Sequence, residues 1–207
     1  MDRDRFIARV AERLGRRDRH VPPVPVASPR TPEDGCSADR DALVHLFCER
    51  LADTGGTATL VPTRRAAQEA VAAILAERGW SSLACPPGVR WPHVSDLWTP
   101  DVRAADLGLS EADLGIAETG TVVVRHEGEL GRSLSLVPRA VGFFLPLSGL
   151  RSSLGEVIAA LDLDAGPLPP ACVSFISGPS HSGDIAGIFV TGVHGPGVVY
   201  VWLIADE

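Results

Sequence analysis

The sequence predicts an α/β fold built around a mainly parallel sheet, because helical and strand-like segments alternate along the chain. Residues 57–61 form a short β-branched run between two stretches with helical periodicity, residues 39–53 and residues 64–78. Residues 198–204, VVYVWLI, are almost continuously apolar, which is typical of a strand covered on both faces of a parallel sheet. These observations favour helices packed on a sheet over a helical bundle.

The two predicted helices have recognisable ends. The helix over residues 39–53 is expected to end before the Gly-Gly pair at residues 55–56. Glycine is common just beyond the C-terminus of a helix. The helix over residues 64–78 has Thr63 as its N-cap residue and ends at Gly79. Each helix carries one apolar face, made of Leu43, Leu46, Phe47 and Leu51 in the first and of Val71, Ile74 and Leu75 in the second.

Shorter elements are predicted further along the chain. A short helix is expected over residues 101–108, and a strand over residues 140–145, which lie between two prolines. A helix capped by Ser152 or Ser153 follows and is expected to end at residue 161.

The C-terminal third predicts a βαβ unit. Residues 172–176 are expected to form a buried strand, residues 177–183 a loop of small residues, and residues 184–193 a helix that leads to the apolar strand 198–204. Ligands of such sheets bind at the carboxyl ends of the strands, so the candidate site is expected at that edge.

Two parts of different character make up the chain. Residues 1–38 contain an amphipathic helix over residues 2–17, followed by a proline-rich linker over residues 20–36. Residues 39–207 are expected to form one globular domain, which is a common domain size.

Charge and residue types exclude several classes of function. The 207 residues carry a formal net charge of −7, with a pI of about 5.3, which argues against a nucleic-acid partner. All 19 basic residues are arginine, so the chain cannot form a lysine Schiff base or supply a Walker-type lysine. The four cysteines and six histidines lack metal-binding spacings, so no metal is expected. No apolar run is long enough to span a membrane. The arginine-rich first 20 residues contain interleaved acids, unlike a transit peptide, and a secretory apolar region is missing, so a cytoplasmic location is expected.

The turn at residues 118–121 is the first candidate site. Two apolar runs, residues 114–117 and 122–124, flank Glu118, Thr119, Gly120 and Thr121. Glu118 is the candidate catalytic acid, base or nucleophile, and the hydroxyls and the glycine amide beside it could bind an anion. The alternative is structural, with Gly120 providing a turn and Glu118 capping it.

Two further segments are candidates for anion binding. Gly178, Ser180 and Ser182 precede the helix expected at residue 184, where free amides and the helix dipole attract anions. His194 and Gly195 follow the end of that helix. We expect these segments and the Glu118 turn to converge on one pocket; the alternative is three unrelated turns.

Three motifs together carry a resemblance to a known family. They are Ala-Asp at residues 112–113 with Ile-Ala-Glu-Thr-Gly-Thr at 116–121, Ser-Gly-Pro-Ser at 177–180 with Asp-Ile at 184–185, and Gly-Val-His-Gly-Pro at 192–196. In this order and spacing they resemble the lactate-utilisation protein C family (the LUD domain), from about residue 39 to the C-terminus. The resemblance implies a three-layer α/β/α fold with a mainly parallel sheet, similar to the NagB/RpiA/CoA transferase-like group.

The resemblance also implies a role in oxidising L-lactate to pyruvate alongside iron–sulfur partner proteins. Since this chain lacks the clustered cysteines of a related cluster-bearing protein, we expect an accessory subunit whose partners hold the iron–sulfur clusters. The alternative is a free-standing enzyme of sugar-phosphate isomerase or CoA-transferase type. His181, Ser182 and Gly183 stand where the family usually has Arg-Thr-Ala, so an anion contact made by that arginine would be lost or altered.

Overall fold

The computed structural model describes residues 3–13, 39–86, 95–126, 132–161, 172–185 and 188–206. The chain divides into two compact units, Met1–Asp34 and Gly35–Glu207. The first unit contains the described helix α1 (Arg3–Arg13), which falls within the helix predicted over residues 2–17. The proline-rich stretch 20–36 lies outside the described residues. All other elements below belong to the second unit.

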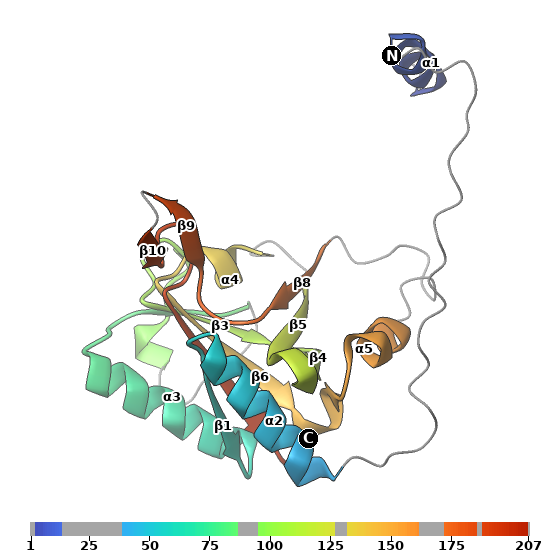
Figure 1. Cartoon of the computed structure of the whole chain (residues 1–207). Coiled ribbons are helices and arrows are strands. Elements are labelled where there is room, and N and C mark those ends of the chain that lie inside the picture. The colour runs from blue at the N-terminus through green and yellow to red at the C-terminus, as the bar shows by residue number, and fades with distance from the viewer. Residues whose placement is uncertain are drawn as a thin grey trace. The chain divides into compact units, whose positions relative to one another are not determined.

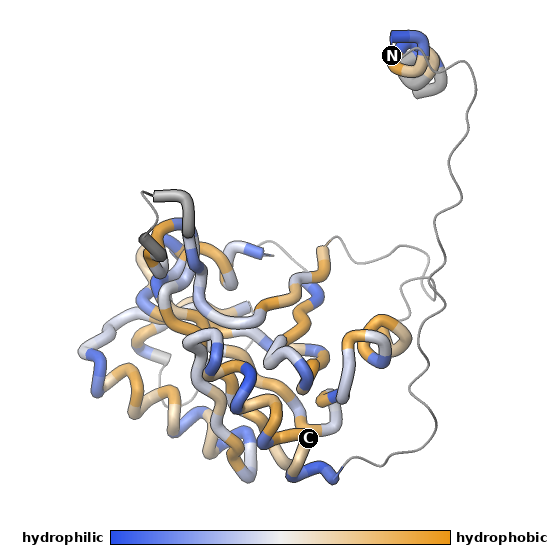
Figure 2. The backbone as a smooth tube through the Cα atoms, in the orientation of Figure 1, coloured by the Kyte–Doolittle hydropathy of each residue, from blue (hydrophilic) through white to orange (hydrophobic). Residues whose placement is uncertain are grey.

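A five-stranded parallel sheet forms the centre of the second unit (Figure 1). Its strands are β1 (Thr57–Val61), β2 (Leu83–Ala84), β3 (Leu107–Glu111), β6 (Ala140–Pro146) and β11 (Val198–Ile204), in the order β1-β11-β6-β3-β2. Because β11 and β6 lie between other strands, they can be apolar on both faces, and Figure 2 shows the hydrophobic colour along the middle of the sheet. The near-continuous apolar run at residues 198–204 thus has its predicted place.

Alternate side chains of β11 face two different cores. Tyr200, Trp202 and Ile204 pack with the buried face of α3 (Arg64–Arg78), whereas Val199, Val201 and Leu203 pack with Phe47 and Leu51 of α2 (Arg40–Asp53). This alternation follows from the two-residue period of a strand. The sheet is therefore the middle layer of a three-layer α/β/α fold (Figure 1).

The boundaries of α3 follow the capping residues predicted for it, and α2 covers all but the first residue of the helix predicted over residues 39–53. The Thr63 hydroxyl accepts a hydrogen bond from the Ala66 amide at 3.2 Å at the start of α3. Gly79 ends α3 in the left-handed conformation, with φ of +64°. Asp39 caps α2 through its carboxylate, which accepts from the Asp41 amide at 3.2 Å.

A second, smaller sheet packs on the α2 side of the fold, because its Val122 and Val124 share the core of Phe47 and Leu51. It consists of β4 (Leu114–Ile116), β5 (Thr121–His126), β7 (Leu150–Arg151) and β8 (Cys172–Ile176), in the order β7-β4-β5-β8. Helix α5 (Leu154–Leu161) packs on this sheet through Val157 and Leu161. The short helical elements are η1 (Ser95–Leu97), η2 (Ala117–Thr119), α4 (Ser133–Leu136) and η3 (Leu147–Gly149).

The helix predicted over residues 184–193 is wrong. Strands β9 (His181–Ile185) and β10 (Ile188–Thr191) form an antiparallel hairpin there, in which Ser182 pairs with Val190 (Figure 1). The β-branched residues of this segment favour strands over helices. The predicted βαβ unit is also wrong, because β8 belongs to the small sheet and β11 to the central one.

The short helix predicted over residues 101–108 is wrong as well. The chain makes a turn in which the Ala104 amide donates to the Asp101 carbonyl at 3.0 Å, and then enters β3. Strand β3 lies between β6 and β2, and its Leu107 and Leu109 are fully buried. Burial in the sheet therefore outweighs the local helical pattern. In the described part of the chain, no helix is both long and apolar enough to cross a membrane.

Candidate functional site

The Glu118 carboxylate caps a helix. Glu118 lies in η2, between the antiparallel strands β4 and β5, and its Oε1 accepts a hydrogen bond from the Leu154 amide at 2.7 Å. Leu154 is the first residue of α5, where amides lack partners within the helix and the dipole favours an anion. The Glu118 amide in turn donates to the Ser152 carbonyl at 3.1 Å. The turn and the start of α5 are thus joined by two hydrogen bonds.

Glu118→Ala is expected to lower the free energy of unfolding by about 1 kcal/mol, because it removes the acceptor that caps the Leu154 amide at the start of α5. Glu118→Gln keeps an acceptor oxygen and should cost less. Urea denaturation measures both, with Glu69→Ala as the control, since Glu69 makes an exposed ion pair with Arg65 and should cost little. An unchanged stability in Glu118→Ala would contradict the capping role.

The hydroxyls of the Glu118 turn bond to one another. Thr119 Oγ1 and Thr121 Oγ1 lie 2.7 Å apart, and Thr121 Oγ1 lies 2.7 Å from Ser177 Oγ. Thr121 is 3% exposed, so this chain of hydroxyls satisfies a buried polar group and ties β5 to the residue after β8. Between the two threonines, Gly120 has φ of +60° and packs against the backbone of α2 at Leu51.

The segment with Gly178 and Ser180 joins the Glu118 turn to residues 195–196. A Cβ on Gly178 would lie 2.5 Å from Thr54 Oγ1, at the end of α2, so this glycine allows a close approach. The Ser180 amide donates to the Pro196 carbonyl at 2.9 Å. A Cβ on Gly195 would lie 3.0 Å from Ser180 Cβ. These contacts all lie near the starts of β1 and β11.

The predicted site residues other than His194 therefore fall into three groups. Thr119, Gly120, Thr121, Gly178, Ser180 and Gly195 form a continuous line of neighbours at the edge where β1 and β11 begin. This edge, where the parallel strands begin, is called the amino edge below; the expectation of the carboxyl edge is wrong. The Glu118 carboxylate is directed to α5. Ser182 lies within β9, so it does not stand at the start of a helix, and the predicted helix-dipole anion site there is wrong.

His194 and Gly195 line a pocket at the amino edge. This pocket has a volume of about 420 Å³ and is lined by residues 103–105, 136–139 and 192–195. These three segments directly precede β3, β6 and β11, which are neighbours in the central sheet. We call it the amino-edge pocket. Its charged and titratable lining residues are Arg103, Arg139 and the exposed His194.

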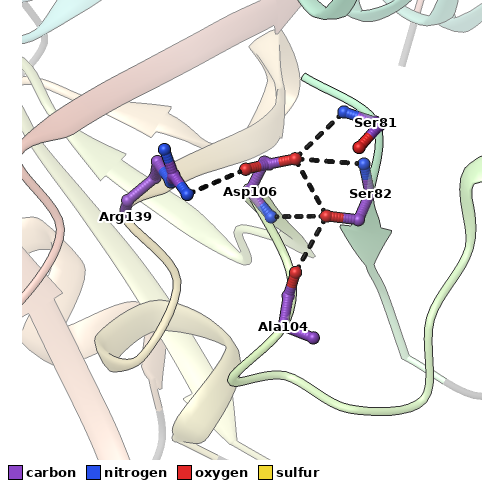
Figure 3. A network of polar contacts seen from close by, with 5 residues as sticks. All are labelled: Ser81, Ser82, Ala104, Asp106 and Arg139. Carbon is purple, nitrogen blue, oxygen red and sulfur yellow. Dashed lines mark hydrogen bonds and ion pairs between the residues drawn. The ribbon is translucent and has the colours of Figure 1, made fainter.

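A partly buried carboxylate, that of Asp106, pairs with Arg139 of this pocket (Figure 3). Asp106 Oδ1 lies 3.2 Å from Arg139 Nη2, and Asp106 Oδ2 accepts from the amides of Ser81 and Ser82 at 2.9 and 3.2 Å. The Ser82 hydroxyl lies 2.9 Å from the same oxygen. Burial would raise the pKa of the Asp106 carboxyl, but these hydrogen bonds and the charge of Arg139 outweigh burial and hold the pKa below its usual value of 3.8. Asp106 is thus an ionised anchor.

Arg103, Asp106 and Arg139 are not among the residues predicted from the sequence. Arg139 directly precedes the strand that was predicted over residues 140–145, and this position was a usable signal, because residues at strand ends lie at a sheet edge. Arg103 and Asp106 were assigned to a helix that does not exist, so their place at the start of β3 could not be inferred.

Similarity to known proteins identifies the family. A family model described as "LUD domain" matches residues 94–204, more than half of the 207 residues. The chain belongs to the LUD domain family. The match covers β3 to β11 and so contains the Glu118 turn, the hairpin β9–β10 and all the lining residues of the amino-edge pocket.

Several relatives of this LUD domain protein have printed names. It is 27% identical to "Lactate utilization protein C" of Bacillus licheniformis, over 100% of this chain and 97% of that protein. It is 40% identical to "Lactate utilization protein C 1" of Bacillus mycoides over 107 residues, which are 51% of this chain and 45% of the relative. That stronger match therefore spans about half of each protein.

A solved structure supports the fold of this LUD domain protein. The crystal structure of a DUF162 family protein from Deinococcus radiodurans aligns with a TM-score of 0.61 and 21% identity, over 80% of this chain and 98% of that chain. At this identity the likeness concerns the fold alone. Among the described residues of the present protein, no group of three or more His, Cys, Asp or Glu side chains is placed to hold a metal ion.

Proposed function

We propose that this LUD domain protein acts in lactate utilisation, as a cytoplasmic accessory subunit of an iron–sulfur system that oxidises L-lactate to pyruvate. The observation that carries the proposal is the alignment of the whole chain with a relative named "Lactate utilization protein C". Oxidation of lactate to pyruvate releases two electrons and two protons, and in this proposal the iron–sulfur clusters of partner proteins accept the electrons.

The geometry of the Glu118 turn supports an accessory role. One oxygen of the candidate catalytic carboxylate accepts from the Leu154 amide, and the neighbouring hydroxyls of Thr119 and Thr121 are hydrogen-bonded within the protein. A general base needs a carboxylate directed to the substrate, whereas this one stabilises the start of α5. The turn therefore supports a structural role for Glu118.

The alternative proposal is a free-standing enzyme that acts on a small anionic molecule. The amino-edge pocket favours it, because a volume of about 420 Å³ falls in the range of small-molecule sites, roughly 300–1,000 Å³. Turnover of a sugar phosphate or an acyl-CoA by the isolated chain would support this alternative over the accessory role.

Deletion of the gene in the native host tests the proposed function. Growth on L-lactate as the carbon source should be lost and should return when the full chain is expressed from a plasmid. Growth on pyruvate, the product of the reaction, should not change. Normal growth of the deletion strain on L-lactate would contradict the proposal, provided that the strain carries no second copy of the gene.

A further inference from the structure

We propose that the amino-edge pocket binds the phosphoryl group of a small polar phosphate ester, which Arg103 and Arg139 hold through their guanidinium groups. The inference concerns binding alone, and it does not depend on the proposed role in lactate oxidation.

The pocket is a cationic site on an acidic protein. The chain has a net charge of −7, yet two arginines line the pocket, and none of the described residues that line it is acidic. Most of the surface that lines the pocket is polar. An anion with several acceptor atoms suits this lining, because a guanidinium group donates hydrogen bonds and accepts none.

Both guanidinium groups have donors to offer. Arg103 is exposed, and its side chain makes no hydrogen bond or ion pair with any residue that the structure describes. Arg139 pairs with Asp106 through Nη2 at 3.2 Å, and a guanidinium group has five N–H donors. Asp106 is itself fixed by Ser81 and Ser82 (Figure 3). The pair thus orients Arg139 and leaves further donors for a ligand.

The loop at residues 192–195 offers main-chain donors at the same pocket. The amides of residues 193–195 make no hydrogen bond with any residue in the described part of the chain. Ser180 holds this loop in place, because its amide donates to the Pro196 carbonyl at 2.9 Å and its carbonyl accepts from the Gly192 amide at 2.8 Å. Donors that are fixed before binding lose less entropy when a ligand arrives.

This set of donors favours a phosphoryl group over a carboxylate. A single guanidinium group can bind both oxygens of a carboxylate through two parallel hydrogen bonds. A phosphoryl group has three terminal oxygens and up to two negative charges, so it can accept from a second guanidinium group and from main-chain amides as well. The two arginines come from different segments, before β3 and before β6, so the pocket offers more donors than one carboxylate needs.

The size of the pocket indicates a ligand larger than a phosphate ion. Its volume of about 420 Å³ falls in the range of small-molecule sites, roughly 300–1,000 Å³. Since the lining is mostly polar, the part of the ligand beyond the phosphoryl group is expected to be small and polar.

NMR titration of the full-length protein tests the inference at constant ionic strength and at pH 8, where a phosphate ester carries about two negative charges. The probes are glycerol 3-phosphate, inorganic phosphate and L-lactate. We expect glycerol 3-phosphate to shift the amide signals of residues 193–195. It should bind at least as tightly as inorganic phosphate and about tenfold more tightly than L-lactate, which is a monocarboxylate.

Two variants test the arginines. Arg103→Gln and Arg139→Gln should each weaken the binding of glycerol 3-phosphate about tenfold or more. The matched control is Arg65→Gln, since Arg65 lies on α3 and pairs with Glu69 outside the pocket. Because Arg103 and Arg139 are exposed, both variants are expected to fold, and a thermal melt checks this.

Three results would each overturn the inference. The first is tighter binding of L-lactate or of inorganic phosphate than of glycerol 3-phosphate. The second is binding of glycerol 3-phosphate that is as tight in Arg103→Gln or Arg139→Gln as in Arg65→Gln. The third is no binding of glycerol 3-phosphate at concentrations of about 10 mM. None of these results bears on growth on L-lactate, so the proposed function is tested separately.

Discussion

Replacing Gly120 with alanine is expected to lower the free energy of unfolding by about 3 kcal/mol. Gly120 has φ of +60°, where a Cβ is strained, and it lies directly against α2. A Cβ there would collide with the Leu51 amide nitrogen and lie 2.7 Å from the Arg50 carbonyl carbon. Backbone atoms of a helix cannot move aside as a flexible side chain can, so α2 or the turn would have to shift. Urea denaturation monitored by circular dichroism measures the loss.

Gly79→Ala is the matched control for this substitution. Gly79 has nearly the same φ, +64°, but in the described part of the chain nothing lies within 4 Å of the position of its Cβ. The control therefore carries the cost of the left-handed conformation alone, about 1 kcal/mol. The difference between the two variants measures the close approach of the turn to α2. Equal losses in both would show that this approach does not stabilise the fold.

Asp106→Asn is expected to lower the free energy of unfolding by about 2 kcal/mol at pH 7. An amide cannot accept from Ser81 and Ser82 on one atom and face Arg139 with the other, because one of its two polar atoms is a donor. The substitution thus places a donor opposite either the serine amides or the guanidinium. Chemical denaturation at fixed pH measures the effect. Asp53→Asn is the control, because the exposed ion pair of Asp53 with Arg50 should contribute little.

The same substitution has a predicted pH dependence. The pKa of Asp106 is lower in the folded protein than in the unfolded chain, so the ionised carboxylate stabilises the fold fully at pH values above its usual pKa of 3.8. This stabilisation is lost as the pH falls through the lowered folded-state pKa. The stability difference between the wild type and Asp106→Asn should therefore shrink below about pH 4. A difference that stays constant across this range would contradict the lowered pKa.

Local sequence signals, namely capping residues and apolar patterns, correctly predicted several elements of the fold. Helix α3 begins after Thr63 and ends at Gly79, as its capping residues indicate, and β1 occupies the predicted residues 57–61. The long apolar strand β11 lies inside the sheet, where its pattern places it. In each of these elements, residue propensities and burial favour the same structure, so the local sequence is sufficient to predict it.

The hairpin β9–β10 has conflicting signals in its sequence, because its apolar residues suit a helix while its β-branched residues favour strands. Its pairing partners are only a few residues apart, and the sequence 184–193 is both apolar and rich in β-branched residues. The misplaced helix led to the prediction of a helix-dipole anion site at Ser182. A helix there would also have made β8 and β11 parallel neighbours in one sheet. The site was therefore expected at the carboxyl ends of those strands.

The role of Glu118 depends on a contact that no local pattern encodes. Its hydrogen-bond partner, the Leu154 amide, lies 36 residues further along the chain. The amino-edge pocket depends on topology even more, because Arg103, Arg139 and His194 come from segments that precede three different strands. Their proximity follows from the order in which β3, β6 and β11 enter the sheet. The order of these strands in the sheet is seen in the three-dimensional structure and not in the sequence.

L-lactate-dependent reduction of a dye acceptor in cell extracts tests the central claim most directly. Extract from a strain that lacks this chain, but contains its proposed iron–sulfur partners, is assayed before and after addition of the purified full-length protein. We predict no lactate-dependent reduction before the addition, restored reduction after it, and no reduction by the purified protein alone. An unchanged rate in the extract that lacks the chain would contradict its role in L-lactate oxidation.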